Sequence, residues 1–93
     1  DLTKSVSTPE LRIDCPDDQK FLIAEKATAY FRQHYDVIEV DGVRVQFAEG
    51  WGLIRASNTQ PALVLRIEAQ SEAKLKEYRA LIDNKLKEFA QQL

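Results

Sequence analysis

One short run of the sequence gathers side chains that could bind an anion. It reads Arg55-Ala56-Ser57-Asn58-Thr59-Gln60-Pro61. Arg55 carries a permanently charged guanidinium with five N–H donors, and the residues after it add hydroxyls and side-chain amides. A tight bend of the chain would add unpaired backbone N–H groups, and no acidic residue interrupts the run. With Arg55, Ser57, Asn58 and Thr59 as candidate ligands, the run predicts an oxyanion site, most readily for phosphate.

The same run is also typical of an ordinary turn. Ser, Asn and Thr are common in loops because their short side chains bond nearby backbone groups. An arginine near a strand end is often only a solvated charge. Turn formation accounts for Ser57, Asn58 and Thr59, although it does not require Arg55, so composition alone leaves both interpretations open.

Apolar segments flank the run on both sides and predict β-strands. Trp51-Gly52-Leu53-Ile54 precedes it and residues 62–69 follow it, and branched and apolar side chains favour strands. The run would then be the loop between two strands. The buried side of the first strand stays open at this point. A two-residue turn before it would bury Ile54, whereas a three-residue turn would bury Trp51 and Leu53.

A half-buried strand and an amphipathic helix are predicted nearer the N-terminus. Residues 10–15 alternate between charged and apolar side chains, which is the period of a strand. From Gln19 to about His34, apolar residues recur at helical spacings of three and four, which would place Lys20 on the solvent side. The predicted buried stripe of this helix consists of Phe21, Ala24, Thr28, Phe31 and Tyr35.

The clearest local signal is Asp41-Gly42 between two alternating apolar segments. Asp-Gly favours a two-residue type I′ turn, because both central residues of that turn take positive φ. The resulting hairpin would place Val40 opposite Val43. Ile38 would lie opposite Val45, so that both strands turn the same apolar face inward.

A second amphipathic helix is predicted at the C-terminal end, with Ser71 as N-cap and Glu72 in the first turn. Its predicted buried stripe consists of Leu75, Tyr78, Ile82, Leu86, Phe89 and Leu93. The order β-α-β-β-β-β-α predicts an α+β fold with a mostly antiparallel, four- to five-stranded sheet and both helices on one face, because this arrangement covers every apolar stripe. The other face would present Arg12, Asp14, Arg44, Gln46, Arg66 and Glu68 to solvent or to another domain.

One domain with an N-terminal linker is the expected organisation. The chain has 93 residues and no methionine, not even at position 1, so we expect a piece of a longer protein. Residues 1–9 are polar and contain several structure breakers, as in a linker from an upstream domain. Residues 10–93 provide enough apolar side chains for a single small core.

Composition argues against several classes of protein. The net charge is −2, whereas proteins that bind duplex nucleic acid usually carry a basic excess. No apolar run approaches the roughly 20 residues of a membrane span, and no signal-peptide pattern opens the sequence. Cys15 is the only cysteine, which excludes an intramolecular disulfide and favours a reducing compartment, the cytoplasm. Its acidic neighbours Asp14 and Asp17 predict a buried, inert thiol.

No catalytic group and no metal site are predicted within the chain. His34 is the only histidine and is interpreted as a surface residue or a cap near a helix end, where a cation is favoured. No Asp-x-Asp cluster is present, and neither Ser57 nor any other serine has a neighbouring base. A serine without such a base is a weak nucleophile.

The run from Arg55 to Pro61 resembles the phosphate-binding loop in the last domain of the α-D-phosphohexomutases, whose general pattern is Arg-x-Ser-Gly-Thr-Glu-Pro. Asp41-Gly42-Val43-Arg44-Val45 and Gly50-Trp51-Gly52-Leu53-Ile54 are similar to the bacterial phosphomannomutase/phosphoglucomutase branch, and the resemblance extends from about Leu11 to the C-terminal helix. Asn58 stands where Gly is usual, and Asn can occupy the same positive-φ turn. Gln60 stands where Glu is usual, which removes a negative charge.

This resemblance implies a TATA-box-binding-protein-like fold and a parent enzyme, an isomerase, that interconverts 1-phospho and 6-phospho sugars. The parent would use a phosphoserine, Mg²⁺ and a glucose 1,6-bisphosphate-type activator, with a bisphosphorylated sugar as intermediate. In this chain Arg55, Ser57, Asn58 and Thr59 would bind the phosphate that is not reacting. The chain would bind no cofactor, would be inactive alone, and would be a monomer whose partners are the phosphosugar and the upstream domains.

A module that binds nucleic acid or protein through the open sheet face is the alternative. Arg12, Arg44 and Arg66 would lie across that face. Sheets that bind single-stranded RNA usually offer aromatic stacking platforms, whereas the outward positions here are expected to be charged or polar. That expectation and the acidic balance both disfavour the alternative.

Overall fold

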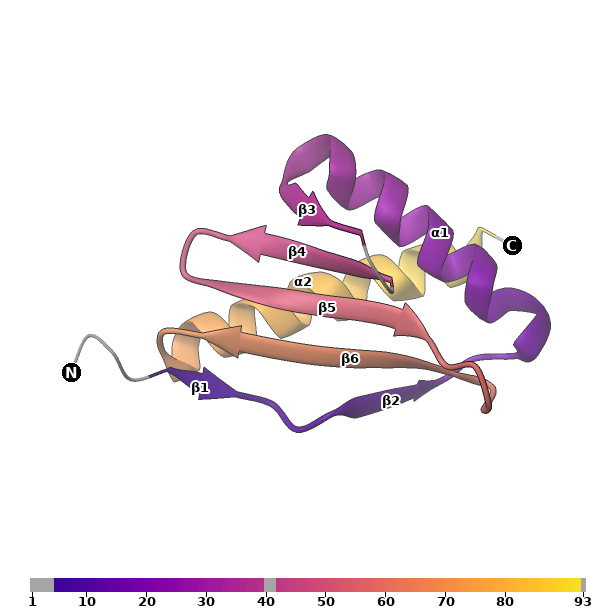
Figure 1. The fold of residues 1–93 in the computed structure, drawn as a ribbon, viewed down its shortest axis with the longest axis horizontal. Coiled ribbons are helices and arrows are strands. Elements are labelled where there is room, and N and C mark those ends of the chain that lie inside the picture. Colours follow the sequence, from indigo (N-terminus) through magenta and orange to yellow (C-terminus); the bar gives the residue numbers. More distant parts are fainter. Residues whose placement is uncertain (1–4, 40–41, 93) are drawn as a thin grey trace.

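Two helices cover one face of an antiparallel sheet in the computed structural model, which describes residues 5–39 and 42–92 (Figure 1). The elements are β1 (Val6–Ser7), β2 (Leu11–Asp14), α1 (Asp17–His34), β3 (Asp36–Ile38), β4 (Val43–Phe47), β5 (Gly50–Ala56), β6 (Ala62–Ala69) and α2 (Glu72–Gln91). The helices contact each other, and both contact β5 and β6. The predicted α+β class and the placement of both helices on one face are confirmed.

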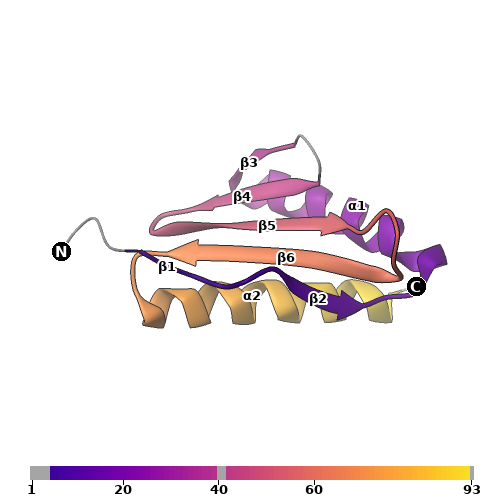
Figure 2. The same ribbon diagram turned by 60° about the horizontal axis from the view of Figure 1, so that its bottom comes forward.

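The sheet has six strands, because the N-terminal strand is divided in two. The strand order is β1-β6-β5-β4-β3, and β2 also pairs with β6. β1 and β2 follow one another along the same edge of β6 (Figure 2). Thr8 lies between them, and its backbone N–H donates to the Ile67 carbonyl at 2.9 Å while its hydroxyl accepts from the Ile67 N–H at 3.1 Å.

The sequence predicts residues 1–9 as a linker, but these bonds attach a part of that segment to the sheet. Val6 and Ser7 pair with β6, and Thr8 is buried. The role of residues 1–9 as a connection to an upstream domain stays a prediction. The described residues of that segment nevertheless belong to the folded unit.

The hydrophobic core lies between the helices and the inner face of β4, β5 and β6. Ile54, Leu65 and Ile82 are fully buried there, and burial of each such side chain contributes about 1.5–3 kcal/mol to stability. The buried residues of α2 are Tyr78, Ile82, Leu86 and Phe89, as predicted. Leu75 is partly buried against the core, and Leu93 lies outside the described residues.

The predicted stripe of α1 is wrong at its N-terminal end. Phe21 is 55% exposed, whereas Lys20 is buried together with Ile23, Ala27 and Phe31. Three other residues of the predicted stripe are partly buried, namely Ala24, Thr28 and Tyr35. The helix is turned so that Lys20, rather than Phe21, faces the interior. Lys20 follows the helical spacing of Ile23 and Ala27, and its Nζ reaches the carbonyl of Gln60 in the loop before β6.

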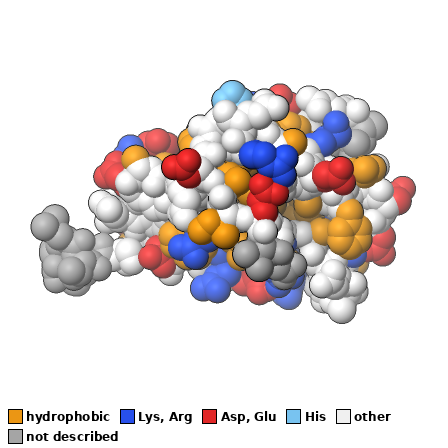
Figure 3. Space-filling view, turned by 45° about the horizontal axis from the view of Figure 1, so that its top comes forward, with side chains coloured by type: hydrophobic (Ala, Val, Ile, Leu, Met, Phe, Trp, Pro, Cys, Tyr) orange, Lys and Arg blue, Asp and Glu red, His pale blue; other side chains and the backbone are white. Residues whose placement is uncertain are grey.

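The outer side of α1 exposes apolar surface at Phe21 and Leu22. The space-filling view turned toward α1 and β3 shows hydrophobic areas separated by charged side chains of both signs (Figure 3). Single apolar side chains among charges are ordinary on a protein surface.

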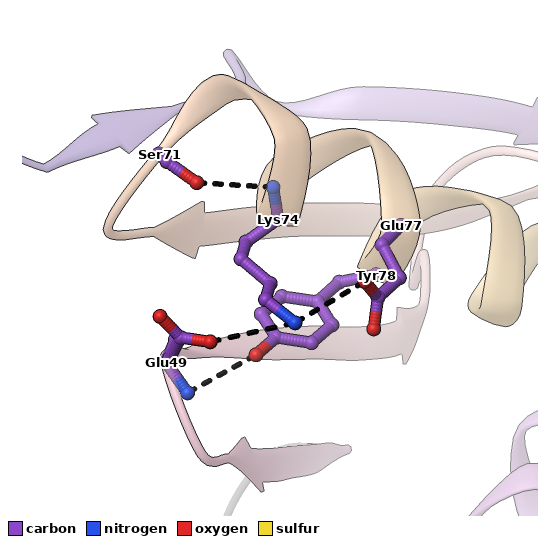
Figure 4. Close-up of polar contacts among 5 residues, drawn as sticks. All are labelled: Glu49, Ser71, Lys74, Glu77 and Tyr78. Carbon is purple, nitrogen blue, oxygen red and sulfur yellow. Dashed lines mark hydrogen bonds and ion pairs between the residues drawn. The ribbon is translucent and has the colours of Figure 1, made fainter.

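A two-residue turn at Ala48-Glu49 settles which side of β5 is buried. Phe47 pairs with Gly50, so Ile54 faces the helices while Trp51 lies on the other face. The turn is also fastened to α2, because the Glu49 N–H donates to the Tyr78 hydroxyl at 3.0 Å. Lys74 Nζ lies 3.4 Å from the Glu49 carboxylate and 3.3 Å from that of Glu77, and Ser71 caps the same helix as predicted (Figure 4).

The predicted pairing of β3 with β4 is wrong by one residue. Val37, not Ile38, lies opposite Val45, and Ile38 lies opposite Arg44. Since neighbouring residues of a strand face opposite sides, this shift moves Ile38 to the outer face, where it is 47% exposed. The predicted pair of Val40 with Val43 lies outside the described residues, as does Asp41.

The sheet face away from the helices carries the predicted charged and polar side chains, together with an aromatic residue that the sequence left undecided. The pairing places Trp51 opposite Gln46 and Leu53 opposite Arg44 on this face. The Arg44 guanidinium lies 4.2 Å from the centre of the Trp51 ring, a cation–π contact. Since Arg44 already covers the ring, the indole is not a free platform for a nucleic-acid base.

Candidate anion-binding loop

The loop between β5 and β6 is organised around Ser57. The Ser57 N–H donates to the Ala62 carbonyl at 2.9 Å and closes the loop. Ser57 Oγ accepts hydrogen bonds from the backbone N–H groups of Thr59 at 3.3 Å and Gln60 at 3.2 Å. Ser57 is 6% exposed. The sequence predicts Ser57 as a ligand, and the structure adds that its oxygen shapes the bend, while its hydroxyl proton can still be donated.

Asn58 and Thr59 form the exposed rim of this loop. Among the described residues, no hydrogen bond engages the Asn58 N–H or the side chain of either residue. These groups are therefore available to an incoming acceptor. Asn58 does not adopt the positive φ expected for a Gly substitute, because Gly42 is the one described residue with positive φ. The bonds to Ser57 Oγ provide the bend without it.

Arg55 stands at the start of the loop, near the end of β5. It pairs with Val64 across the sheet, and Val64 pairs in turn with Arg12, so both arginines lie on the outer face. Arg55 Nη2 lies 4.0 Å from Glu10 Oε1, and Arg12 Nη2 lies 3.7 Å from the same oxygen. A distance of 4.0 Å is too long for a hydrogen bond. Arg55 is therefore near a carboxylate but not locked onto it, and the sequence did not point to Glu10.

The glycine that precedes β4 supports Arg55 from a neighbouring part of the fold. A Cβ atom built on Gly42 would lie 2.3 Å from the Ile54 carbonyl oxygen and 2.6 Å from Arg55 Cβ. The φ of Gly42 is 94°, which an L side chain rarely adopts. The backbone of Gly42 thus lies directly against the base of the arginine.

The far end of the loop contacts the connection between β2 and α1 and the first turn of α1. The Cys15 N–H donates to the Pro61 carbonyl at 2.9 Å, and Lys20 Nζ donates to the Gln60 carbonyl at 2.9 Å. The sequence places Lys20 on the solvent side, and the structure corrects this. The signal that could have found it is its helical phase, since Lys20 lies three and seven residues before Ile23 and Ala27.

Cys15 is a buried thiol, in agreement with its sequence interpretation. It is 5% exposed. Burial raises the pKa of this thiol, and the nearby carboxylate of Asp18 raises it further, although the charge of Lys20 acts in the opposite direction. A raised pKa disfavours the reactive thiolate. Cys15 therefore contributes its backbone to the loop rather than its sulfur.

The fold and this loop define the chain as a small α+β domain that presents a bend rich in free donors at the end of two paired strands. Residues 10–85 match the family described as phosphoglucomutase/phosphomannomutase, C-terminal domain. The chain belongs to that family, which confirms the resemblance of the sequence.

Individual relatives support this assignment. A phosphomannomutase/phosphoglucomutase of Pseudomonas aeruginosa is 44% identical over 84 residues, which cover 88% of this chain and 18% of the relative. A phosphoglucomutase of Neisseria gonorrhoeae is 43% identical over 90 residues, covering 89% of this chain and 20% of the relative. A solved structure of a phosphoglucomutase/phosphomannomutase family protein from Burkholderia thailandensis aligns with a TM-score of 0.72 and 34% identity, over 96% of this chain and 19% of that one.

The chain spans about a fifth of the length of these relatives. Across residues 5–39 and 42–92, neither helix is both long and apolar enough to cross a membrane. The same described residues contain no group of three His, Cys, Asp or Glu side chains placed to hold a metal ion.

Proposed function

We propose that this chain binds the non-reacting phosphate of a phosphosugar within a phosphomannomutase/phosphoglucomutase. The observation that carries the proposal is the exposed rim of the loop, where the Asn58 N–H and the Asn58 and Thr59 side chains have no partner among the described residues. Arg55 at the loop entrance supplies the charge, since its guanidinium can make paired contacts with phosphate oxygens. Ser57 supplies a hydroxyl proton and the shape of the bend.

The proposed contribution to catalysis is positioning. If the loop binds the phosphate at one end of the sugar, the other end is placed against the phosphoryl donor. The entropic cost of aligning the reacting groups then falls on the binding step rather than on the chemical step. Because either phosphate must fit the same loop in turn, the loop should recognise the phosphate rather than the sugar. The chain would therefore contribute little to the choice between mannose and glucose.

The reacting groups are proposed to lie elsewhere in the parent protein. Its reaction would be phosphoryl transfer between 1-phospho and 6-phospho sugars through a bisphosphorylated sugar, with a phosphoserine, Mg²⁺ and a glucose 1,6-bisphosphate-type activator. We propose that the phosphoserine and the residues that bind Mg²⁺ belong to other domains of the parent. The chain alone would be inactive and monomeric, in the cytoplasm, with the upstream domains as its partners.

We further propose that the domain moves relative to the rest of the parent, so that the loop closes over the substrate and releases the intermediate. Residues 1–9 would provide the connection. Because β1 pairs with β6 and Thr8 is buried, residues 6–8 would belong to the moving body. The moving body would then include β1, β2 and the loop as one unit.

An NMR titration of the chain with glucose 6-phosphate tests the proposal. We expect amide shifts concentrated at residues 55–60 and a Kd in the millimolar range, about 4 kcal/mol of binding free energy. Arg55→Ala should abolish the localised shifts, whereas Arg79→Ala, on the exposed side of α2, should retain them. Shifts that are spread evenly over the surface, or that survive in Arg55→Ala, would contradict the proposal.

A further inference from the structure

Lys20 is a buried lysine whose ammonium group contacts the candidate loop. Its exposed fraction is 4%. Nζ donates to the Gln60 carbonyl oxygen at 2.9 Å and lies 2.8 Å from Asp17 Oδ1. Gln60 directly follows Thr59 in the loop, so the ammonium lies on the buried side of the same bend whose rim carries the free donors.

Local physical chemistry disfavours a lysine at this position. Lys20 lies in the first turn of α1, where the helix dipole favours negative charge. Burial of an ammonium is unfavourable unless its charge and its donors find partners, and lysines generally extend their charged end to water. The position is explained by what Lys20 contacts, a carbonyl forty residues away in the sequence, and not by the helix itself.

A second hydrogen bond, from a residue other than Lys20, also holds this end of the loop. The Cys15 N–H donates to the Pro61 carbonyl at 2.9 Å, so two consecutive carbonyls of the loop are bound, one by the connection between β2 and α1 and one by the first turn of α1. The Ala62 N–H also donates to the Gln60 carbonyl at 2.8 Å. These bonds fix the C-terminal half of the bend, while Ser57 Oγ fixes its N-terminal half.

We propose that Lys20 is a positioning residue for anion binding: it holds the loop in its binding conformation through Gln60 and adds a positive charge beneath it. This inference rests on the function proposed above. A loop that is already ordered loses less freedom when it binds a ligand, which increases its affinity. The buried ammonium acts in the same direction, because a buried charge is less screened than one at the surface, although the ion pair with Asp17 at 2.8 Å offsets part of its charge.

The test compares Lys20→Met with Lys26→Met, an exposed lysine on the same helix. Both variants remove one positive charge and keep an unbranched side chain. Lys20→Met should fold, because the partner left behind, Asp17, has a 72% exposed side chain and the Gln60 carbonyl keeps its bond from Ala62. If Lys20→Met does not fold, Lys20→Gln provides the same comparison.

Each variant is titrated with glucose 6-phosphate by NMR well below its Tm. The amide chemical shifts of Asn58 and Thr59 are recorded before ligand is added. We expect Lys20→Met to shift these two amides and to weaken binding by about three- to tenfold, while Lys26→Met changes neither. If Lys20 contributed to stability alone, Lys20→Met would have a lower Tm, but its amide chemical shifts at Asn58 and Thr59 and the Kd of its folded form would be unchanged. That result would overturn the inference about Lys20.

Failure of this inference can be distinguished from failure of the proposed function. If the unmodified chain shows no localised shifts with glucose 6-phosphate, the loop is not a phosphate site, and both proposals fall. If the unmodified chain binds and Arg55→Ala does not, but Lys20→Met binds as the unmodified chain does, only the role of Lys20 is refuted.

Discussion

Gly42 lies so close to Arg55 that a methyl group on its Cα would come within 2.6 Å of Arg55 Cβ. Gly42 therefore limits the space at the base of the arginine side chain. The positive φ of Gly42, 94°, and the close Ile54 carbonyl both require a residue without a side chain. The backbone of Gly42 thus lies directly beside the base of Arg55.

We predict that Gly42→Ala lowers both stability and phosphosugar affinity. The methyl group would meet backbone and Cβ atoms that cannot move easily, and alanine is strained at this φ, so we expect a loss of about 2 kcal/mol or more. Urea denaturation measures the loss of stability, and the titration with glucose 6-phosphate measures the affinity. Normal affinity in the folded variant would show that Gly42 does not position Arg55.

Ser57→Ala should weaken the loop specifically. The change removes the acceptor for the Thr59 and Gln60 N–H groups, with an expected loss of about 1–2 kcal/mol in stability and about tenfold in phosphosugar affinity. Ser71→Ala is the matched control, because Ser71 Oγ accepts from the Lys74 N–H at a helix start. It should lose about 1 kcal/mol without a change in affinity. Equal affinities of the two variants would contradict the role of Ser57.

Tyr78→Phe should destabilise the fold without affecting the loop. The Glu49 N–H would lose its partner, at an expected cost of about 1 kcal/mol, while the ring could still stack on Phe47, whose centroid lies 4.2 Å away. The affected turn and the candidate loop lie at opposite ends of β5, so the affinity should be unchanged. Chemical denaturation with a constant m-value measures the loss.

The control for this change is Tyr35→Phe. Tyr35 is a partly buried tyrosine, less buried than Tyr78, and its hydroxyl makes no hydrogen bond within the described part of the chain. Its removal should therefore change stability little. A loss as large as that of Tyr78→Phe would show that the bond to Glu49 is not the cause.

Glu39→Gln should remove a part of the stability that depends on pH. Arg32 donates from Nε to Glu39 Oε2 at 2.8 Å and from Nη2 to Oε1 at 2.6 Å, and these hydrogen bonds lower the pKa of Glu39. A carboxyl whose pKa is lowered by folding stabilises the fold above its unfolded-state pKa, and this contribution disappears as the pH falls through the folded-state pKa. The original chain should thus exceed Glu39→Gln in Tm near neutral pH and match it in strong acid.

Thermal unfolding between about pH 7 and pH 2 measures this difference. Glu25→Gln is the control, since Glu25 is an exposed carboxylate on α1 that forms no ion pair among the described residues. Its Tm should differ little from that of the original chain at every pH. A Glu39→Gln difference that persists in acid would exclude the ion pair with Arg32 as its origin.

Several features of the chain could be predicted because they depend on neighbours in the sequence. The stripe of α2 follows from helical spacing, and Ser71 is a good cap whatever surrounds it. The donor-rich run from Arg55 to Pro61 could likewise be recognised from residue types. The α+β class followed because an antiparallel sheet with both helices on one face covers the apolar sides of these elements together.

Other features depend on which residue of the neighbouring strand lies opposite, and these became clear only in the folded structure. The two-residue turn at Ala48-Glu49 selected the side of β5 on which Ile54 is buried, and the pairing of β3 with β4 moved Ile38 outward. Each of these alternatives differs by one residue in register, and local patterns do not fix the register between strands.

The same distinction applies to the candidate site. The donors that the loop contains could be read from the residue types alone, because they are properties of the side chains and of the backbone. Only the fold decided that Gly42 lies against Arg55 and that Lys20 reaches Gln60. Gly42 meets Arg55 through the pairing of β4 with β5, and Lys20 meets Gln60, forty residues away in the sequence, only when α1 packs against the sheet.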